Sequence, residues 1–218
     1  ASACPTTSAR PPRPSRSACS ARSAIASGPT GPSTSTGKQI AAAVNLYVQQ
    51  NGSTVAGRKV EVILKDDTGV ADVTRRIAQE LIVNEKVNVI AGIEVTPAAL
   101  AIAPLAREAK VPAVVMAAGT SIITERSPYI VRTSFTLPQS SVIIADWAAK
   151  NNIKKVVTMV SDYAPGADAE KSFTERFKAA GGVIAEAIKV PLASPDFAPF
   201  LQRAADAKPD AIFIFVPS

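Results

Sequence analysis

Apolar positions along this chain follow two different spacings, which alternate from residue 37 onward. Apolar residues recur every three or four positions over residues 40–48, which predicts an amphipathic helix ending at the turn dipeptide Asn51-Gly52. Over residues 59–65 they recur at every second position, which predicts a strand. The same reasoning predicts further helices at 73–82, 97–109, 139–150, 167–180 and 197–207, and further strands at 87–90, 113–116, 129–132, 156–160, 183–190 and 211–215.

Regular alternation of helices and strands is typical of α/β proteins, in which helices flank parallel sheets. An irregular stretch interrupts the alternation after Thr120, and the alternation restarts at Leu137. We therefore expect two lobes joined near residues 132–135. Lobe 1 is expected at residues 37–133 and lobe 2 at residues 134–218, each of them partial.

The tract before the first predicted helix has a different composition. Residues 1–36 consist mainly of Ala, Ser, Thr, Pro and Arg, with Ile25 as the one large aliphatic residue. Such a segment buries too little apolar surface to offset its ordering entropy, which predicts disorder and no opening strand. It lacks the apolar run of a signal peptide. A GC-rich gene read in the wrong frame would also give this composition.

Charge and cysteine content narrow the possible functions. The net charge is +6, but four of the 24 basic residues are arginines in the first 36 positions, which leaves 20 basic against 18 acidic residues. Because the remainder is almost neutral, no nucleic-acid partner is expected. Cys4 and Cys19 lie in the same tract, where both a disulfide and a chance pair remain open. Histidine is absent, so neither a Ser-His-Asp nor a Cys-His arrangement exists in this chain and an enzyme is not expected.

Hydroxyl-bearing loops mark a candidate site within residues 87–121. This stretch reads as strand, helix, strand, and its two strands are followed by the loops Val95-Thr96-Pro97 and Gly119-Thr120-Ser121. In a parallel sheet these loops meet at one edge, where ligands bind. Each loop also precedes a predicted helix, whose first N–H groups attract anions. A small anionic ligand is therefore expected at this edge.

Purely structural roles are equally open to some of the candidate residues. Thr96 is suited to cap the helix that follows it, and Tyr163 lies in a Pro/Gly-containing loop where an exposed turn residue is also common. The Asp66-Asp67 pair resembles a metal site but is better explained as a strand-end turn. Residues 31–38 resemble a phosphate-binding loop, but the spacing of the glycines is wrong and no Ser or Thr follows Lys38. No metal or cofactor is expected.

Several segments, taken in order, resemble the periplasmic leucine/isoleucine/valine-binding protein family. The resemblance rests on GKQIAAAVNLY, EVILKDDTG, NVIAGIEVTPAALA, VPAVVMAAGTS, YIVRTSF and VVTMVSDYAPGADA. It implies a two-lobed type I periplasmic-binding fold, incomplete at both ends in this chain. It also implies a binding protein that closes over a branched-chain or other apolar amino acid, or a related small carboxylate, and delivers it to the permease of an ABC importer in the periplasm.

The resemblance also assigns site residues. Thr96 stands where the family binds the ligand carboxylate, with Pro97 beside it, and Tyr163 stands where an aromatic residue covers the ligand. The loop that contacts the ligand through backbone and hydroxyl groups contains Ala117, Ala118, Gly119 and Thr120.

Two departures from the family pattern bear on the ligand. Gly119 replaces a hydroxyl residue of the amino-acid binders, and Thr36 stands at an aromatic position. They argue against a strict leucine binder and keep amides and aromatic acids open. A ligand-sensing effector or receptor domain of the same bilobed fold is the alternative function.

Overall fold

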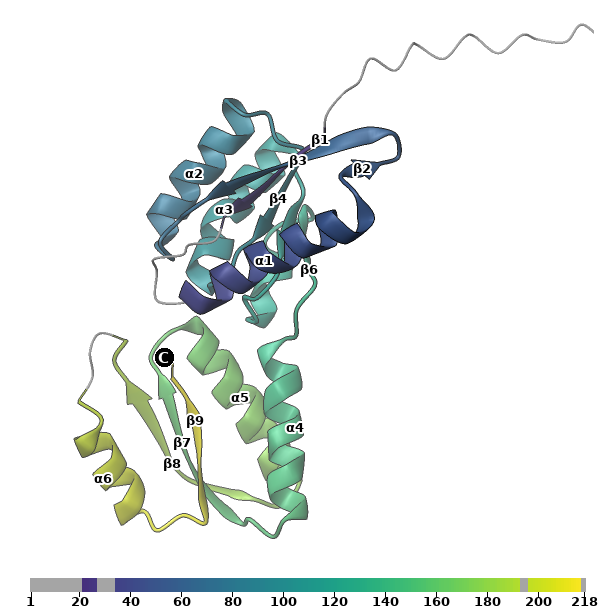
Figure 1. The fold of residues 1–218 in the computed structure, drawn as a ribbon. Helices are drawn as coiled ribbons and strands as arrows, with labels where there is room; N and C mark the ends of the chain where they lie inside the picture. Colours follow the sequence, from purple (N-terminus) through teal and green to yellow (C-terminus); the bar gives the residue numbers. More distant parts are fainter. Residues whose placement is uncertain (1–20, 27–33, 193–195, 217–218) are drawn as a thin grey trace, which may run out of the picture.

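The computed structural model describes residues 21–26, 34–192 and 196–216, and they form two α/β lobes (Figure 1). Each lobe has its own sheet, with strand orders β2-β3-β1-β4-β5-β6 and β8-β7-β9. All neighbouring strands are parallel except the β2–β3 hairpin. The expectation of parallel sheets flanked by helices in a two-lobed α/β protein is confirmed.

Lobe 1 is built on the larger sheet. Its strands are β1 (Ala21–Ala26), β2 (Thr54–Val55), β3 (Arg58–Lys65), β4 (Val89–Gly92), β5 (Ala113–Val115) and β6 (Ile130–Arg132). Its helices are α1 (Thr34–Asn51), α2 (Ala71–Val83), α3 (Thr96–Ala109) and the short 3₁₀ helix η1 (Ser121–Glu125). Helix α1 crosses one face of the sheet, opposite to α2 and α3 (Figure 1).

Strand β1 corrects the prediction that the N-terminal tract contains no opening strand. It occupies a central position, where Ile25 pairs with Leu64 of β3 on one side and with Ala91 of β4 on the other. The prediction was wrong at residues 21–26 because this strand pairs with β3 on one side and β4 on the other, and the mixed composition ARSAIA gives no strand pattern in the sequence. Residues 1–20 and 27–33 lie outside the described part of the chain. They include Cys4, Cys19 and residues 31–33 of the phosphate-loop candidate.

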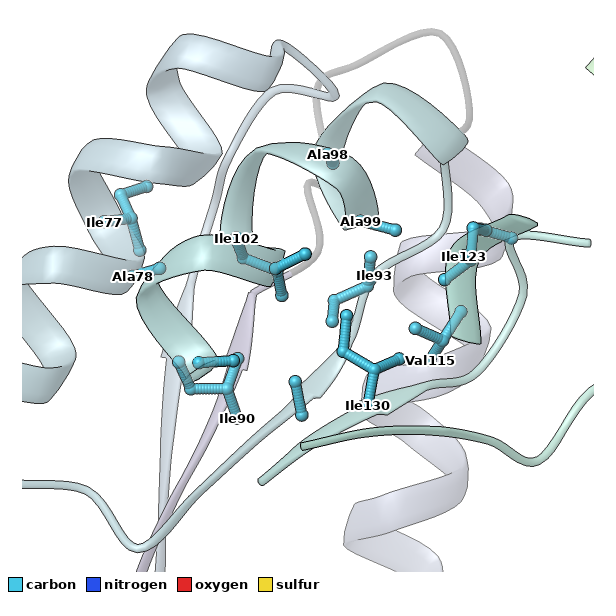
Figure 2. Packing of buried hydrophobic residues seen from close by; sticks show 14 of the residues in the cluster. Ile77, Ala78, Ile90, Ile93, Ala98, Ala99, Ile102, Val115, Ile123 and Ile130 are labelled. Atoms are coloured by element: carbon cyan, nitrogen blue, oxygen red, sulfur yellow. The ribbon is translucent and has the colours of Figure 1, made fainter. Parts of the chain in front are cut away.

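The core of lobe 1 lies between the sheet and the helices α2 and α3 (Figure 2). Small buried residues of α3 let this helix lie close to the sheet, where isoleucines from the strands and their loops fill the remaining space. Burying one such side chain stabilises the fold by about 1.5–3 kcal/mol. This packing fixes the start of α3 relative to the ends of β4 and β5. The central members are Ile90, Ile93, Ala98, Ala99, Ile102, Val115, Ile123 and Ile130.

Lobe 2 is built on the three-stranded sheet, whose central strand, β7, is buried along almost its whole length. Its elements are α4 (Leu137–Lys150), β7 (Lys155–Ser161), α5 (Ala164–Ala179), β8 (Val183–Val190), α6 (Ala198–Asp206) and β9 (Ala211–Phe215). Val156 and Val160 of β7 face the core beneath α5, whereas Val157 and Met159 face the core beneath α6. This two-sided burial explains why the strand reads as a nearly continuous apolar run.

The lobes are joined by the chain between β6 and α4. Helix α4 begins with a capping box, in which the Thr136 side chain accepts from the Gln139 N–H and the Gln139 side chain accepts from the Thr136 N–H. The Leu137 N–H donates to the Gly119 carbonyl at 2.9 Å. The start of lobe 2 is therefore tied to a candidate ligand loop of lobe 1. Among the described helices, none combines the length and apolarity needed to cross a membrane.

Candidate ligand-binding site

A cavity of about 220 Å³ opens where the loops of the two lobes meet. Lobe 1 contributes the loops after β4 and β5, and lobe 2 contributes the start of α4, the loop after β7 and the end of β9. The lining residues are Glu94, Val95, Thr96, Ala117, Ala118, Gly119, Phe135, Leu137, Tyr163, Pro165 and Phe215. Five of the seven residues predicted from sequence line this cavity; Pro97 and Thr120 do not.

Two larger hollows, of about 260 and 450 Å³, lie on the surface of lobe 1 along α2 and α3. Their charged lining residues, Glu108, Arg107 and Arg126, are all exposed. Neither hollow is lined by a buried polar group that a ligand would satisfy, and the lining residues of both belong to lobe 1 alone. The smaller cavity between the lobes is the better candidate site.

A buried pair of hydroxyl groups connects the two loops of lobe 1 at the cavity. Thr96 Oγ1 and Thr120 Oγ1 lie 2.7 Å apart, and both residues are buried. Thr96 is already the first residue of α3, whose N-cap is Val95 and makes no side-chain capping bond. The Thr96 side chain therefore does not act as the cap, and its hydroxyl pairs with the second loop instead. In that loop, Arg132 Nη1 donates to the Thr120 carbonyl at 2.7 Å.

Small residues form the wall between the hydroxyl pair and lobe 2. Ala117, Ala118 and Gly119 line the cavity with little side-chain volume. A Cβ atom added at Gly119 would lie 3.3 Å from Leu137 Cγ, so the glycine keeps the loop close to the start of α4. Pro97 is exposed at the beginning of α3, outside the cavity. It shapes the helix start and does not line the cavity.

Aromatic rings close the cavity from lobe 2. Tyr163 and Phe215 stack with their ring centroids 6.5 Å apart and an interplanar angle of 25°. Burial raises the pKa of the Tyr163 hydroxyl above its usual value of 10.0, so Tyr163 remains neutral near pH 7. Phe135 adds a third ring at the lobe junction and is 57% exposed. Sequence reasoning missed Phe215 and Phe135. Phe215 lies at the end of a predicted strand and Phe135 at the predicted lobe junction, and these positions could have identified them as cavity residues.

Glu94 is the charged member of the lining, and sequence reasoning also missed it. Only 8% of this residue is exposed, and neither carboxyl oxygen has a hydrogen-bond partner of normal geometry among the described residues. Burial, with the nearby charges of Asp67 and Asp66, raises the pKa of Glu94 from 4.5 to about 7, and the Gly37 backbone N–H offsets this only in part. Its position two residues before Thr96 was the signal that could have identified it.

The Asp66-Asp67 pair forms a turn, as its position at a strand end indicated. Asp66 Oδ1 accepts from the Thr68 N–H at 2.8 Å, and Asp67 accepts from the Gly69 N–H at 3.1 Å and from the Thr74 hydroxyl at 2.8 Å. These bonds shape the chain between β3 and α2. Within the described ranges, no group of three or more His, Cys, Asp or Glu residues is arranged to hold a metal ion.

A side-chain contact also joins the two lobes beside the cavity. Asp168, in the second turn of α5, accepts hydrogen bonds from the Ser121 N–H at 2.8 Å and from the Ser121 hydroxyl at 2.9 Å. Ser121 directly follows Thr120, so these bonds hold lobe 2 against the loop that carries the second hydroxyl of the pair. A carboxylate that accepts two bonds from one residue fixes both distance and orientation.

Two α/β lobes with a small cavity between their strand-end loops define the class of bilobed ligand-binding proteins. The periplasmic binding protein family model matches residues 24–218, and the chain belongs to this family. It is 44% identical over 190 residues to the Leu/Ile/Val-binding protein homolog 6 of Brucella abortus, an alignment that covers 87% of this chain and 49% of the relative. The chain thus spans about half the length of the curated relatives it matches.

Solved structures agree with this assignment. A solute-binding protein of an ABC transporter from Rhodopseudomonas palustris BisB5, in complex with 3,4-dihydroxybenzoic acid, is 68% identical with a TM-score of 0.87, covering 91% of this chain and 55% of that one. Another from Rhodopseudomonas palustris HaA2, in complex with p-hydroxybenzoic acid, is 44% identical with a TM-score of 0.89, covering 92% and 55%.

Proposed function

We propose that this protein is the solute-binding component of an ABC importer and that it binds an aromatic carboxylate of benzoate size between its lobes. The observation that carries the proposal is the cavity itself, which is lined by the buried Thr96 from lobe 1 and by the stacked rings of Tyr163 and Phe215 from lobe 2. A ligand with a carboxylate at one end and a flat ring at the other matches both walls. The two similar proteins solved with hydroxylated benzoic acids support this choice of ligand.

The carboxylate end is held by lobe 1. Thr96 donates its hydroxyl hydrogen to the ligand, and the start of α3 contributes backbone N–H groups that lack an intrahelical partner, together with the positive end of the helix dipole. The dipole is worth about 0.3–1 kcal/mol, whereas micromolar affinity needs roughly 8 kcal/mol. Most of the affinity must therefore come from charge-assisted hydrogen bonds and from burial of the ring between the lobes.

The ring end is held by lobe 2. A cavity of about 220 Å³ lies below the roughly 300–1,000 Å³ typical of sites for drug-sized ligands, which favours a single-ring acid. Stacking on Tyr163 and Phe215 adds about 0.5–1.5 kcal/mol beyond area burial. Branched-chain amino acids offer no ring for these walls, so an aromatic acid is preferred over leucine.

Delivery follows from closure of the lobes. The ligand contacts both lobes, so it binds the closed form better than the open form and shifts the population toward closure. The closed form is then recognised by the membrane permease subunits, and the protein works in the periplasm without carrying out a reaction. A sensor or receptor domain of the same fold is the rival; deletion of the gene would then change transcription or signalling and leave uptake of the acid intact.

Thermal melting of the full-length protein with a panel of ligands tests the proposal. Benzoate, 4-hydroxybenzoate, 3,4-dihydroxybenzoate and leucine are compared, because a ligand at 100 times its dissociation constant stabilises the folded state by about 2.7 kcal/mol. A selective rise in melting temperature with the aromatic acids is expected. A rise with leucine alone, or with none of the four, contradicts the proposed ligand class.

A further inference from the structure

Glu94 destabilises the empty site, because the Gly37 backbone N–H compensates for its burial only in part. The residue is more than nine-tenths buried, both of its carboxyl oxygens lack a hydrogen-bond partner of normal geometry, and its side chain lines the cavity. A buried polar group without a partner is unfavourable in the folded state. Such a group in a ligand cavity is explained if the ligand supplies the missing partner.

The rest of the cavity decides what kind of partner is missing. Thr96, two residues further along the chain at the first position of α3, offers a hydroxyl hydrogen to an anionic group. Glu94, when ionised, only accepts hydrogen bonds and repels a second carboxylate. At a pH where Glu94 is ionised, the ligand must therefore present its carboxylate to Thr96 and a hydrogen-bond donor to Glu94, with the ring between them against Tyr163.

We propose that Glu94 accepts a hydrogen bond from a ring hydroxyl of the ligand and makes the site select hydroxylated benzoates over benzoate. This inference rests on the proposed function, and it specifies which aromatic acids the site prefers. Benzoate fills the same cavity but leaves Glu94 without a partner, so the two ligands differ by one charge-assisted hydrogen bond. A site built to bond a hydroxyl group discriminates strongly against the analogue that lacks it.

The selection has a pH dependence. Among the described residues, the charged groups that act on Glu94 are Asp66 and Asp67, from the chain between β3 and α2. The Gly37 backbone N–H of α1 opposes their effect, and Tyr163 shares the cavity from lobe 2. A hydroxyl donor stabilises the ionised carboxylate, so binding lowers the pKa of Glu94 below its value of about 7 in the empty site. The proton is released on binding, and affinity for the hydroxylated acid rises as the pH increases from about 6 to about 8.

The empty protein should lose stability over the same range of pH. Because the pKa of Glu94 is raised in the folded state, the folded protein binds more protons than the unfolded chain between pH 4.5 and about 7. The contribution of Glu94 to the free energy of unfolding therefore decreases as the pH rises through that interval. Glu94→Met, which removes the charge at similar size, is expected to raise the melting temperature of the ligand-free protein at about pH 8.

Calorimetric titration of the full-length protein with 4-hydroxybenzoate and benzoate tests the inference. In Glu94→Met the ratio of the two affinities is expected to fall at least about tenfold relative to wild type. In Glu94→Gln the pH dependence of binding is expected to disappear. Glu108→Gln, at an exposed carboxylate of the same lobe outside the cavity, is the matched control and should change neither quantity.

The outcomes separate the two proposals. If wild type binds neither acid, the proposed function fails. If wild type binds both and Glu94→Met weakens them equally, the function stands and the role of Glu94 is overturned. An unchanged affinity ratio together with a lowered melting temperature in Glu94→Met would assign the residue a structural role and would also overturn the inference.

Discussion

At the scale of single residues, the proposed site contains polar groups that are buried before any ligand arrives. Thr96 and Thr120 share one hydrogen bond across 2.7 Å, although two hydroxyl groups have the capacity for several. Neither carboxyl oxygen of Glu94 has a partner of normal geometry among the described residues. Surrounding core residues keep these groups in place, so little further ordering is needed when a ligand binds.

Removing the Thr96 hydroxyl tests the carboxylate end. Thr96→Val keeps the shape of the side chain and removes the donor, and a hydrogen bond to a charged group contributes about 1.5–3 kcal/mol. Affinity for 4-hydroxybenzoate is therefore expected to fall about tenfold to a hundredfold in calorimetric titration. Thr124→Val, at an exposed position of η1, is the control. Equal affinities of Thr96→Val and wild type would remove Thr96 from the site.

At the scale of elements, the loops are placed by close contacts between helices and strands. Helix α5 starts so near the end of β7 that a Cβ atom at Gly166 would lie 2.0 Å from the Ser161 carbonyl oxygen. Only a residue without a side chain fits there. This close approach positions Tyr163, which directly precedes α5, against Phe215.

Substitution of this glycine should therefore damage lobe 2. Gly166→Ala forces backbone movement at the start of α5, and overpacking of this kind typically costs about 1–3 kcal/mol, with the severe overlap pointing to the upper end. Thermal unfolding is expected to show a clear loss of melting temperature. Ala167→Ser, at the exposed neighbouring position, serves as the control, and a Gly166→Ala protein as stable as wild type would contradict the observed packing.

Sequence patterns predicted helices and strands well where the spacing of apolar side chains matches their burial in the fold. Helices such as α2 and strands such as β7 carry apolar patterns that match their burial. Strand β1 was missed because its pairing with two neighbouring strands places it in the sheet, and the sequence pattern does not show this pairing. Glu94 and Phe215 were missed for a related reason, since their shared cavity exists only once both lobes are assembled.

At the scale of the whole molecule, the proposed function depends on the relative position of the lobes. Asp168 of lobe 2 accepts two hydrogen bonds from Ser121 of lobe 1, next to the loop that lines the cavity. The contact is possible only while the lobes are close together. We therefore expect it to stabilise a closed form in the same direction as the proposed ligand does.

Weakening this contact should lower affinity without changing the cavity. Asp168→Ala removes both bonds, and a loss of about 1.5 kcal/mol of closed-state stability corresponds to roughly tenfold weaker binding. The change is expected mainly in the dissociation rate, measured by stopped-flow fluorescence. Asp162→Asn, at an exposed carboxylate in the neighbouring loop, is the control. An unchanged dissociation rate in Asp168→Ala would show that the contact does not hold the lobes together.

Calorimetric titration of the full-length wild-type protein with 4-hydroxybenzoate, set beside the same titration with leucine, tests the proposed ligand class most directly. One aromatic acid is expected to bind per protein with about micromolar or tighter affinity, and leucine much more weakly, because the cavity combines the Thr96 hydroxyl with aromatic walls. Tight binding of leucine with no heat from the aromatic acid would contradict an aromatic-acid site between the lobes.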